Sequence, residues 1–201
     1  MKIAFVSGAA IALSMLAAPA AQAVVVGSLG TSGTPFVTID SLGARVGGTI
    51  YTADQPFADI PAGGVFNNQF LASGPSSFNP ATITFGSPTL SYLSFLWGSP
   101  DLYNKLTLTT NLGSYDFTVS SLGFAVTNGD QTKSQYVQFK MDSGEFLKSA
   151  KFDVTSPTDA FEVANFRTAV PEPATWALMI MGIGFAGAAM RRRQTVSLKY
   201  A

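Results

Sequence analysis

Residues 97–104 combine the side chains that a small-ligand site needs. Trp97 and Tyr103 offer aromatic faces on which a sugar ring could stack, and Asp101 and Asn104 offer planar polar groups for its hydroxyls. The same residues also fit a structural loop, in which Ser-Pro-Asp sets a turn, Asp101 accepts backbone N–H groups and Trp97 joins the core. The turn chemistry favours the structural loop, and the four residues are kept as a candidate ligand-binding set.

Calcium is a second candidate ligand here, because Asp101, Asn104 and Glu162 carry oxygen donors. No Asp-x-Asp-x-Asp pattern accompanies them, so the sequence assigns no metal site and no cofactor. It assigns no catalytic residue either. Carboxylates are numerous enough that some pair always exists, a Gly-x-Ser-x-Gly nucleophile motif is absent, and no Gly-rich phosphate loop precedes a helix. We therefore expect that the chain is not an enzyme.

The composition narrows the chemistry further. The 201 residues include no Cys and no His, which removes disulfides, thiolate ligands, the commonest general base and the commonest metal ligand. The formal net charge is +0, but residues 24–170 hold seven basic and 11 acidic residues. A nucleic-acid-binding surface is basic, so we expect no nucleic-acid partner.

Residues 1–23 have the pattern of a secretory signal peptide. Lys2 provides the positive start, residues 3–16 are apolar and uncharged, and Ala21 and Ala23 are the small residues at −3 and −1 of a cleavage site. The apolar run is short for a membrane span, which needs ~20 residues. We expect export, removal of this segment by signal peptidase, and a mature chain that begins at Val24.

Residues 174–190 are uncharged and predict a single transmembrane helix. Such a helix would be ~25 Å long, slightly short for the ~30 Å hydrocarbon core of a bilayer. Arg191, Arg192 and Arg193 follow directly, and basic residues at the end of a span favour the cytoplasmic side. Residues 194–201 would then be a cytoplasmic tail, and the larger part of the chain would lie outside the inner membrane.

A proline-rich motif precedes this stretch. Pro171, Glu172 and Pro173 are followed by Trp176 and Ala177, then by the apolar run and the arginines. Paired prolines favour an extended backbone, which is the form that a protease cleft binds. An ordinary single-pass anchor would explain the apolar run and the arginines, but not this motif.

Residues 170–193 resemble the PEP-CTERM sorting signal in its PEPxxWA variant. The resemblance implies recognition by exosortase, a polytopic membrane protease-transferase that cuts near the Pro-Glu-Pro motif and passes the protein outward. It implies a Gram-negative bacterium that makes exopolysaccharide. The expected path is an inner-membrane-anchored precursor that moves to the cell surface or the extracellular matrix.

Residues 24–169 predict one all-β domain, an antiparallel β-sandwich or jelly roll. Short β-rich runs alternate with Gly, Pro, Asn and Ser, and no helical period is found. Residues 24–33 read as a loose N-terminal arm, and Asn128-Gly129 reads as a turn. The predicted strands are residues 36–39, 48–51, 81–85, 90–97, 105–110, 115–120, 136–141, 148–154 and 160–166.

Two segments resemble motifs of PEP-CTERM surface proteins. Residues 98–104 are similar to a Gly-Ser-x-Asp-x-Tyr-Asn loop between two strands, and residues 161–165 are similar to a last strand with Phe-Glu-x-Asp-Asn. Ala164 replaces the Asp of that strand, which puts any metal or sugar role of that Asp in doubt here. The expected function is an exported surface or biofilm-matrix protein associated with exopolysaccharide. A carbohydrate-binding module and a secreted hydrolase of unrecognised type remain the alternatives.

Overall fold

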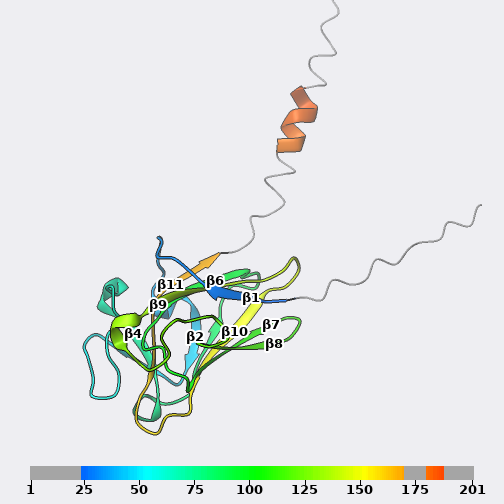
Figure 1. Cartoon of the computed structure of the whole chain (residues 1–201). Coiled ribbons are helices and arrows are strands. Elements are labelled where there is room, and N and C mark those ends of the chain that lie inside the picture. Colours follow the sequence, from blue (N-terminus) through cyan, green and yellow to red (C-terminus); the bar gives the residue numbers. More distant parts are fainter. Residues whose placement is uncertain (1–23, 170–179, 188–201) are drawn as a thin grey trace, which may run out of the picture.

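The computed structural model describes residues 24–169 and 180–187 of the chain. The first of these ranges folds into two antiparallel sheets, and residues 180–187 are helical (Figure 1). The expectation of a mostly β, antiparallel architecture is therefore confirmed. The predicted signal peptide, the Pro-Glu-Pro motif, most of the predicted membrane helix and the C-terminal tail lie outside the described residues. Within the described ranges, no helix is both long and apolar enough to cross a membrane.

Eleven strands build the two sheets of residues 24–169. The larger sheet has the spatial order β1 (Val26–Leu29), β9 (Gln135–Lys140), β6 (Tyr92–Trp97), β11 (Phe161–Ala169), β4 (Phe70–Ser73) and β3 (Thr49–Tyr51). The smaller sheet has the order β2 (Gly43–Val46), β5 (Ala81–Phe85), β10 (Leu147–Val154), β7 (Asn104–Thr110) and β8 (Ser114–Thr118). Short 3-10 turns occur in the connections, namely η1 (Ile39–Ser41), η2 (Phe66–Asn68), η3 (Pro75–Ser77) and η4 (Gln131–Lys133).

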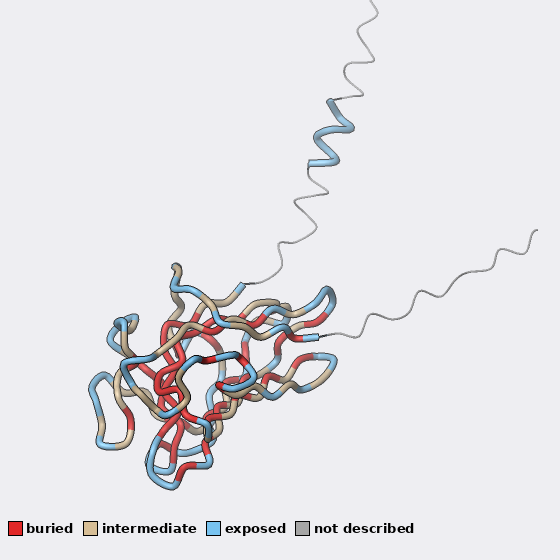
Figure 2. The backbone as a smooth tube through the Cα atoms, in the orientation of Figure 1, coloured by how far each residue is buried: buried red, intermediate tan, exposed pale blue. Residues whose placement is uncertain are grey.

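Strands β7 and β10 each bury one face in the core and leave the other face partly exposed to solvent. Along β7 every second residue, including Leu106 and Leu108, is buried, while the threonines between them are half-buried. In β10, Ala150, Phe152 and Val154 are buried in the same alternating way. Successive side chains of a strand point to opposite faces, so this alternation puts one face of the sheet into the core. Figure 2 shows the buried segments running through the middle of the domain, with exposed loops at its margins.

A layer of aromatic rings joins the two sheets. Phe95 of β6 has no exposed surface, and its ring lies 5.5 Å from that of Phe152 on β10 in the opposite sheet. Phe139 on β9 and Phe117 on β8 make a second contact between the sheets, at 4.8 Å. Edge-on and tilted ring pairs of this kind add ~0.5–1.5 kcal/mol each beyond the area they bury. The core thus forms without any disulfide.

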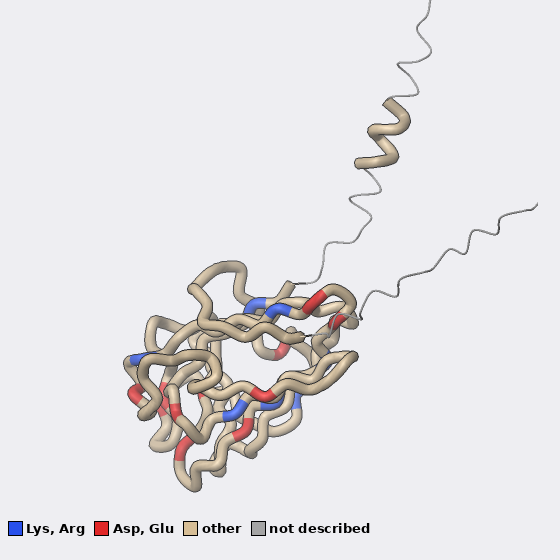
Figure 3. The backbone as a smooth tube through the Cα atoms, turned by 45° about the vertical axis from the view of Figure 1, so that its right-hand side comes forward, with Lys and Arg blue, Asp and Glu red and all other residues tan. Residues whose placement is uncertain are grey.

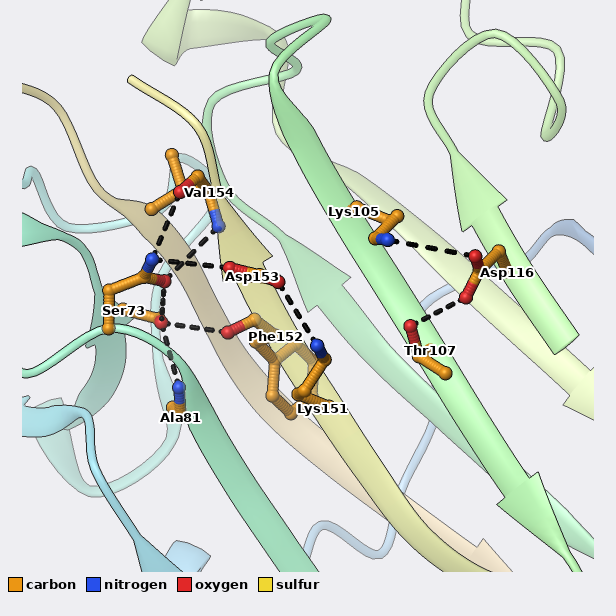
Figure 4. Close-up of polar contacts among 10 residues, drawn as sticks. Ser73, Ala81, Lys105, Thr107, Asp116, Lys151, Phe152, Asp153 and Val154 are labelled. Carbon is orange, nitrogen blue, oxygen red and sulfur yellow. Dashed lines mark hydrogen bonds and ion pairs between the residues drawn. The ribbon is translucent and has the colours of Figure 1, made fainter. Parts of the chain in front are cut away.

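Polar side chains also join the sheets at one end. Ser73 of β4 is fully buried, and its hydroxyl donates to the Phe152 carbonyl across the core at 2.8 Å (Figure 4). The same oxygen accepts the Ala81 backbone N–H. Asn79 exchanges two hydrogen bonds with the backbone of Val154. These contacts satisfy backbone groups that would otherwise be buried without a partner.

Most of the predicted strands are present, with several corrections. Residues 81–85 are β5 as predicted, and seven other predicted segments overlap observed strands. Residues 36–39 are not a strand, and Ile39 instead begins η1. The supposed loose arm at residues 24–33 contains β1, which pairs with β9. Strands β2 and β4 were not predicted.

The chain enters and leaves the larger sheet at the same end. Val26 pairs with Lys140, Lys140 with Tyr92, and Tyr92 with Ala169, so the start of β1 and the end of β11 share one row of residues. Neighbouring strands lie ~4.8 Å apart, which puts Val26 and Ala169 about 14 Å from each other. At the opposite end, β6 finishes at Trp97 and β11 begins at Phe161. In Figure 1, the blue start of β1 and the orange end of β11 lie on the same side of the domain.

The aromatic layer predicts a large effect of one substitution. Phe95→Ala should lower the free energy of unfolding by ~3–5 kcal/mol, because it leaves a cavity between the sheets. Denaturation by urea, followed by tryptophan fluorescence, measures this loss. Leu102→Ala is the control, since Leu102 is 65% exposed and its removal should change stability by less than ~0.5 kcal/mol. Equal effects of the two substitutions would contradict the assignment of Phe95 to the core.

Candidate functional site

The loop between β6 and β7 is fixed by its own hydrogen bonds. The Asp101 N–H donates to the Ser99 carbonyl at 3.0 Å, and the Asn104 side chain donates to the same carbonyl at 3.0 Å. The Asn104 N–H in turn donates to the Asp101 carbonyl. The Gly98 N–H reaches the Glu162 carbonyl of β11 at 2.8 Å. The loop therefore lies against the start of β11, and its shape does not depend on a ligand.

The four candidate ligand-binding residues separate into two pairs. Trp97 has no exposed surface, and its ring packs 4.3 Å from that of Phe161. Asn104 is also fully buried and holds the loop. A sugar therefore has no access to the Trp97 ring in this structure. Asp101 and Tyr103 do line a cavity, so the structure brings only these two members of the set together at a surface.

This cavity has a volume of about 250 Å³ and lies beside the end of β6 and the start of β11. Residues 55–59 form one wall, the β6–β7 loop forms another, and residues 128–131 close a third side. Its lining is mostly polar and comprises Gln55, Pro56, Phe57, Ala58, Asp59, Ser99, Asp101, Tyr103, Asn128, Gly129, Gln131, Asp159 and Glu162. Figure 3 shows several acidic positions near one another at the lower left of the domain.

Glu162 is the most buried carboxylate of the cavity. The residue is 2% exposed, and its Oε2 accepts hydrogen bonds from the Ser99 hydroxyl at 2.6 Å and from the Ser99 N–H at 3.4 Å. Burial raises the pKa of Glu162 to about 8, against the lowering effect of these hydrogen bonds, and Asp101 adds to the rise. The side chain is thus mainly protonated at neutral pH and carries an O–H donor into the cavity.

The pKa values of the neighbouring acidic groups are also raised. Burial raises the pKa of Asp101, although Tyr103 and Ser99 lower it by hydrogen bonding, and Asp159 raises it further. Burial and the hydrogen bond to Asp101 raise the pKa of Tyr103, which keeps its hydroxyl protonated. Burial and the charge of Asp54 raise the pKa of Asp59, against a hydrogen bond from Gln131. The cavity is acidic, and its acidic groups interact.

Two glycines make room for the carboxylates. A side chain at Gly98 would meet Glu162 Cβ at 2.8 Å, and a side chain at Gly129 would overlap the Asp101 carboxylate. Gly129 also has a φ of +77°, a conformation that glycine adopts without strain. The turn that the sequence places at Asn128-Gly129 therefore packs directly on Asp101, to which Asn128 is bridged.

The cavity also contains residues that the sequence does not single out. Asp59, Gln131 and Asp159 come from three separate connections, and no local pattern marks them. The sequence marks Glu162 only as an oxygen donor for calcium and as part of the Phe-Glu-x-Asp-Asn resemblance. In the described part of the chain, no group of three or more His, Cys, Asp or Glu side chains is placed to hold a metal ion.

The C-terminal segment matches a known family model. Residues 169–193 match the PEP-CTERM protein-sorting motif. No curated protein and no solved structure matches the chain. The motif implies an exported protein that is targeted to exosortase, with a membrane-anchored precursor that moves to the cell surface. The matched segment begins at Ala169, the residue that ends β11. Pro171, Glu172, Pro173 and the three arginines lie outside the described residues.

The burial of Glu162 predicts a pH dependence of stability. Its pKa is about 8 in the folded chain against an ordinary value of 4.5, so it favours folding most below pH 4.5 and loses this contribution as the pH rises to about 8. Glu162→Gln removes the effect. The variant should match the parent near pH 5 and exceed it by on the order of a few kcal/mol near pH 8.5.

Urea denaturation of the purified processed protein at the two pH values measures this difference. Asp142→Asn, which removes a carboxylate outside the cavity, is the control. A stability difference between Glu162→Gln and the parent that is the same at pH 5 and pH 8.5 would contradict the prediction.

Proposed function

We propose that the domain of residues 24–169 is a non-enzymatic component of the surface or extracellular matrix of a Gram-negative bacterium, associated with exopolysaccharide. Signal peptidase removes residues 1–23, and exosortase cuts near Pro171, Glu172 and Pro173. The single observation that carries the proposal is the sorting motif at residues 169–193. It follows a central strand of the larger sheet without any intervening domain.

The fold suits a protein that works outside the cell. The chain has no Cys, and its core relies on buried aromatic rings rather than on disulfides. Its stability therefore needs no oxidising machinery after export. The edge strands of the two sheets are short, since β1, β3, β2 and β8 have four, three, four and five residues. Short edge strands limit uncontrolled pairing with other chains at high local concentration.

The exit of the chain suggests how the precursor is oriented. Only residues 170–173 separate β11 from the predicted membrane helix at residues 174–190, and four residues span no more than ~14 Å. Val26 lies in the same row as Ala169. In the precursor, this end of the sheet faces the membrane. The cavity at the other end faces outward.

Intact mass and cell fractionation test the proposal in the native host, with and without exosortase. With exosortase, the protein should lack residues 1–23 and the segment beyond about residue 171, and it should leave the inner membrane. Without exosortase, residues 174–201 should remain, and the protein should stay in the inner membrane. Glu172→Gln should also retain precursor, because it changes the recognition motif.

Asp40→Asn is the matched control, since it removes an exposed carboxylate far from the motif in the sequence and should leave processing unchanged. A protein that keeps residues 176–201 in the inner membrane of the wild-type host would overturn the sorting proposal. The domain would then be a tethered periplasmic protein.

A further inference from the structure

The cavity between β6, β11 and residues 55–59 has lining groups that select against anions. Four carboxylates face it, from Asp59, Asp101, Asp159 and Glu162, and none of its lining residues is Lys or Arg. The remaining polar groups are amides and hydroxyls. Phosphate, sulfate or an acidic peptide would therefore meet repulsion without any compensating charge. Hydrogen-bond acceptors predominate, which favours a ligand rich in donors.

The size of the cavity limits the ligand further. Its volume of about 250 Å³ lies below the ~300–1,000 Å³ that is usual for drug-sized ligands. A single ring with its substituents fits such a space better than a folded peptide or an extended cofactor. The cavity lies at the edge of the domain, so a ring at the end of a longer chain can enter it.

Glu162 offers a ligand in the cavity a carboxyl oxygen to bind. It is 98% buried and lines the cavity, and Ser99 occupies its Oε2. The other carboxyl oxygen, Oε1, accepts no hydrogen bond from any other residue in the described part of the chain. Oε1 is not one of the fully enclosed side-chain oxygens that lack a partner in the described residues, so it opens into the cavity, where water or a ligand can bond to it. Gly98 keeps the adjoining space free of a side chain.

We propose that this cavity binds one sugar residue that carries no negative charge, through hydrogen bonds between its hydroxyls and the side chains of Asp101, Asp159 and Glu162. Neighbouring hydroxyls of a sugar both donate and accept, which matches a cavity that offers carboxyl oxygens beside the Tyr103 and Ser99 hydroxyls. The inference deepens the proposed matrix function by naming a ligand for the domain. The inference rests on the proposed function only for the location of the sugar, which is the cell surface or the extracellular matrix.

A metal ion fits the cavity less well. The carboxylates are not gathered into a set of three or more that could hold one in the described ranges. Ser99 already binds Glu162 Oε2, and burial keeps Glu162 protonated near neutral pH. A hard cation prefers several ionised oxygens at short distance. Binding of Ca²⁺ is therefore the competing hypothesis that the experiment tests.

Binding can be measured on the full chain in a detergent without sugar groups, by saturation-transfer NMR. The probes are glucose, N-acetylglucosamine and glucosamine, with glucuronate as the anionic counterpart and ethanolamine as a cation without a ring. At least one of the first three should bind, and glucuronate and ethanolamine should not. Asp101→Asn and Glu162→Ala should each weaken binding about tenfold or more, because the first replaces a carboxylate acceptor oxygen with an amide N–H and the second removes the carboxyl group.

Asp142→Asn is the control, since Asp142 follows β9 at the other end of the sheet, and it should leave binding unchanged. Thermal unfolding of each variant separates loss of the site from loss of the fold, and Asp101→Asn gives a second test if Glu162→Ala fails to fold. The proposal is overturned if no neutral or amino sugar binds, if glucuronate or ethanolamine binds as well as glucose, or if Ca²⁺ alone occupies the cavity. Release of reducing sugar from a bound oligosaccharide would also overturn it, in favour of an enzyme. The measurement needs no exosortase, so its failure is distinct from a failure of the sorting proposal.

Discussion

The packing of Phe95 between the two sheets is the interaction on which the rest of the domain depends. Its ring contacts Phe152 across the core and lies beside Trp97, Phe139 and Phe166 on neighbouring strands. These contacts fix β6 and β11 side by side at the centre of the larger sheet. With no Cys in the chain, the free energy of such apolar contacts is the main source of stability. The polar cavity lies beside one end of these two strands, and the chain leaves the domain at the other end of β11.

Strand β11 connects the polar cavity with the sorting motif. At its start, Glu162 forms part of the polar cavity and is held by Ser99 from the end of β6. At its end, Ala169 leads into the sorting motif. Glu162 and Ala169 are seven residues apart on β11, and a rise of ~3.3 Å per residue separates the cavity from the exit of the chain by about 23 Å. One strand thus sets both where the chain is tethered and where a ligand would be met.

The sequence predicted what local patterns encode and missed what depends on distant contacts. The alternation of apolar and polar residues predicts β7 and β10, because one face of each strand is buried and the other is partly exposed to solvent. Strand β4 has no such alternation, since residues such as Ala58 cover its outer face and bury all four of its positions. Strand β1 contains Gly27 and Ser28, which have low β-propensity, and pairing with β9 determines its conformation.

The candidate site was predicted only in part for the same reason. Asp101 and Tyr103 lie where their loop suggests, but the burial of Trp97 reflects aromatic neighbours from β11 and from residues 119–124 that a linear motif does not reveal. Asp59 and Asp159 reach the cavity from connections far apart in the sequence. A cavity assembled from four segments has no sequence signature. Glu162 is marked in the sequence only as an oxygen donor and as part of the Phe-Glu-x-Asp-Asn resemblance, and neither pattern reveals its burial beside Ser99.

The orientation of the domain relative to the membrane is the most direct test of this account. Because the chain has no Cys, one fluorophore can be attached through Ser143→Cys, at the end where β1 begins and β11 ends, or through Thr155→Cys, beyond the end of β10 at the opposite end. The full chain is placed in vesicles that contain a spin-labelled lipid headgroup, and quenching is compared. If the end of the sheet at Ala169 faces the membrane, quenching is strong at position 143 and weak at position 155. Equal quenching at both positions, or stronger quenching at position 155, would contradict this orientation.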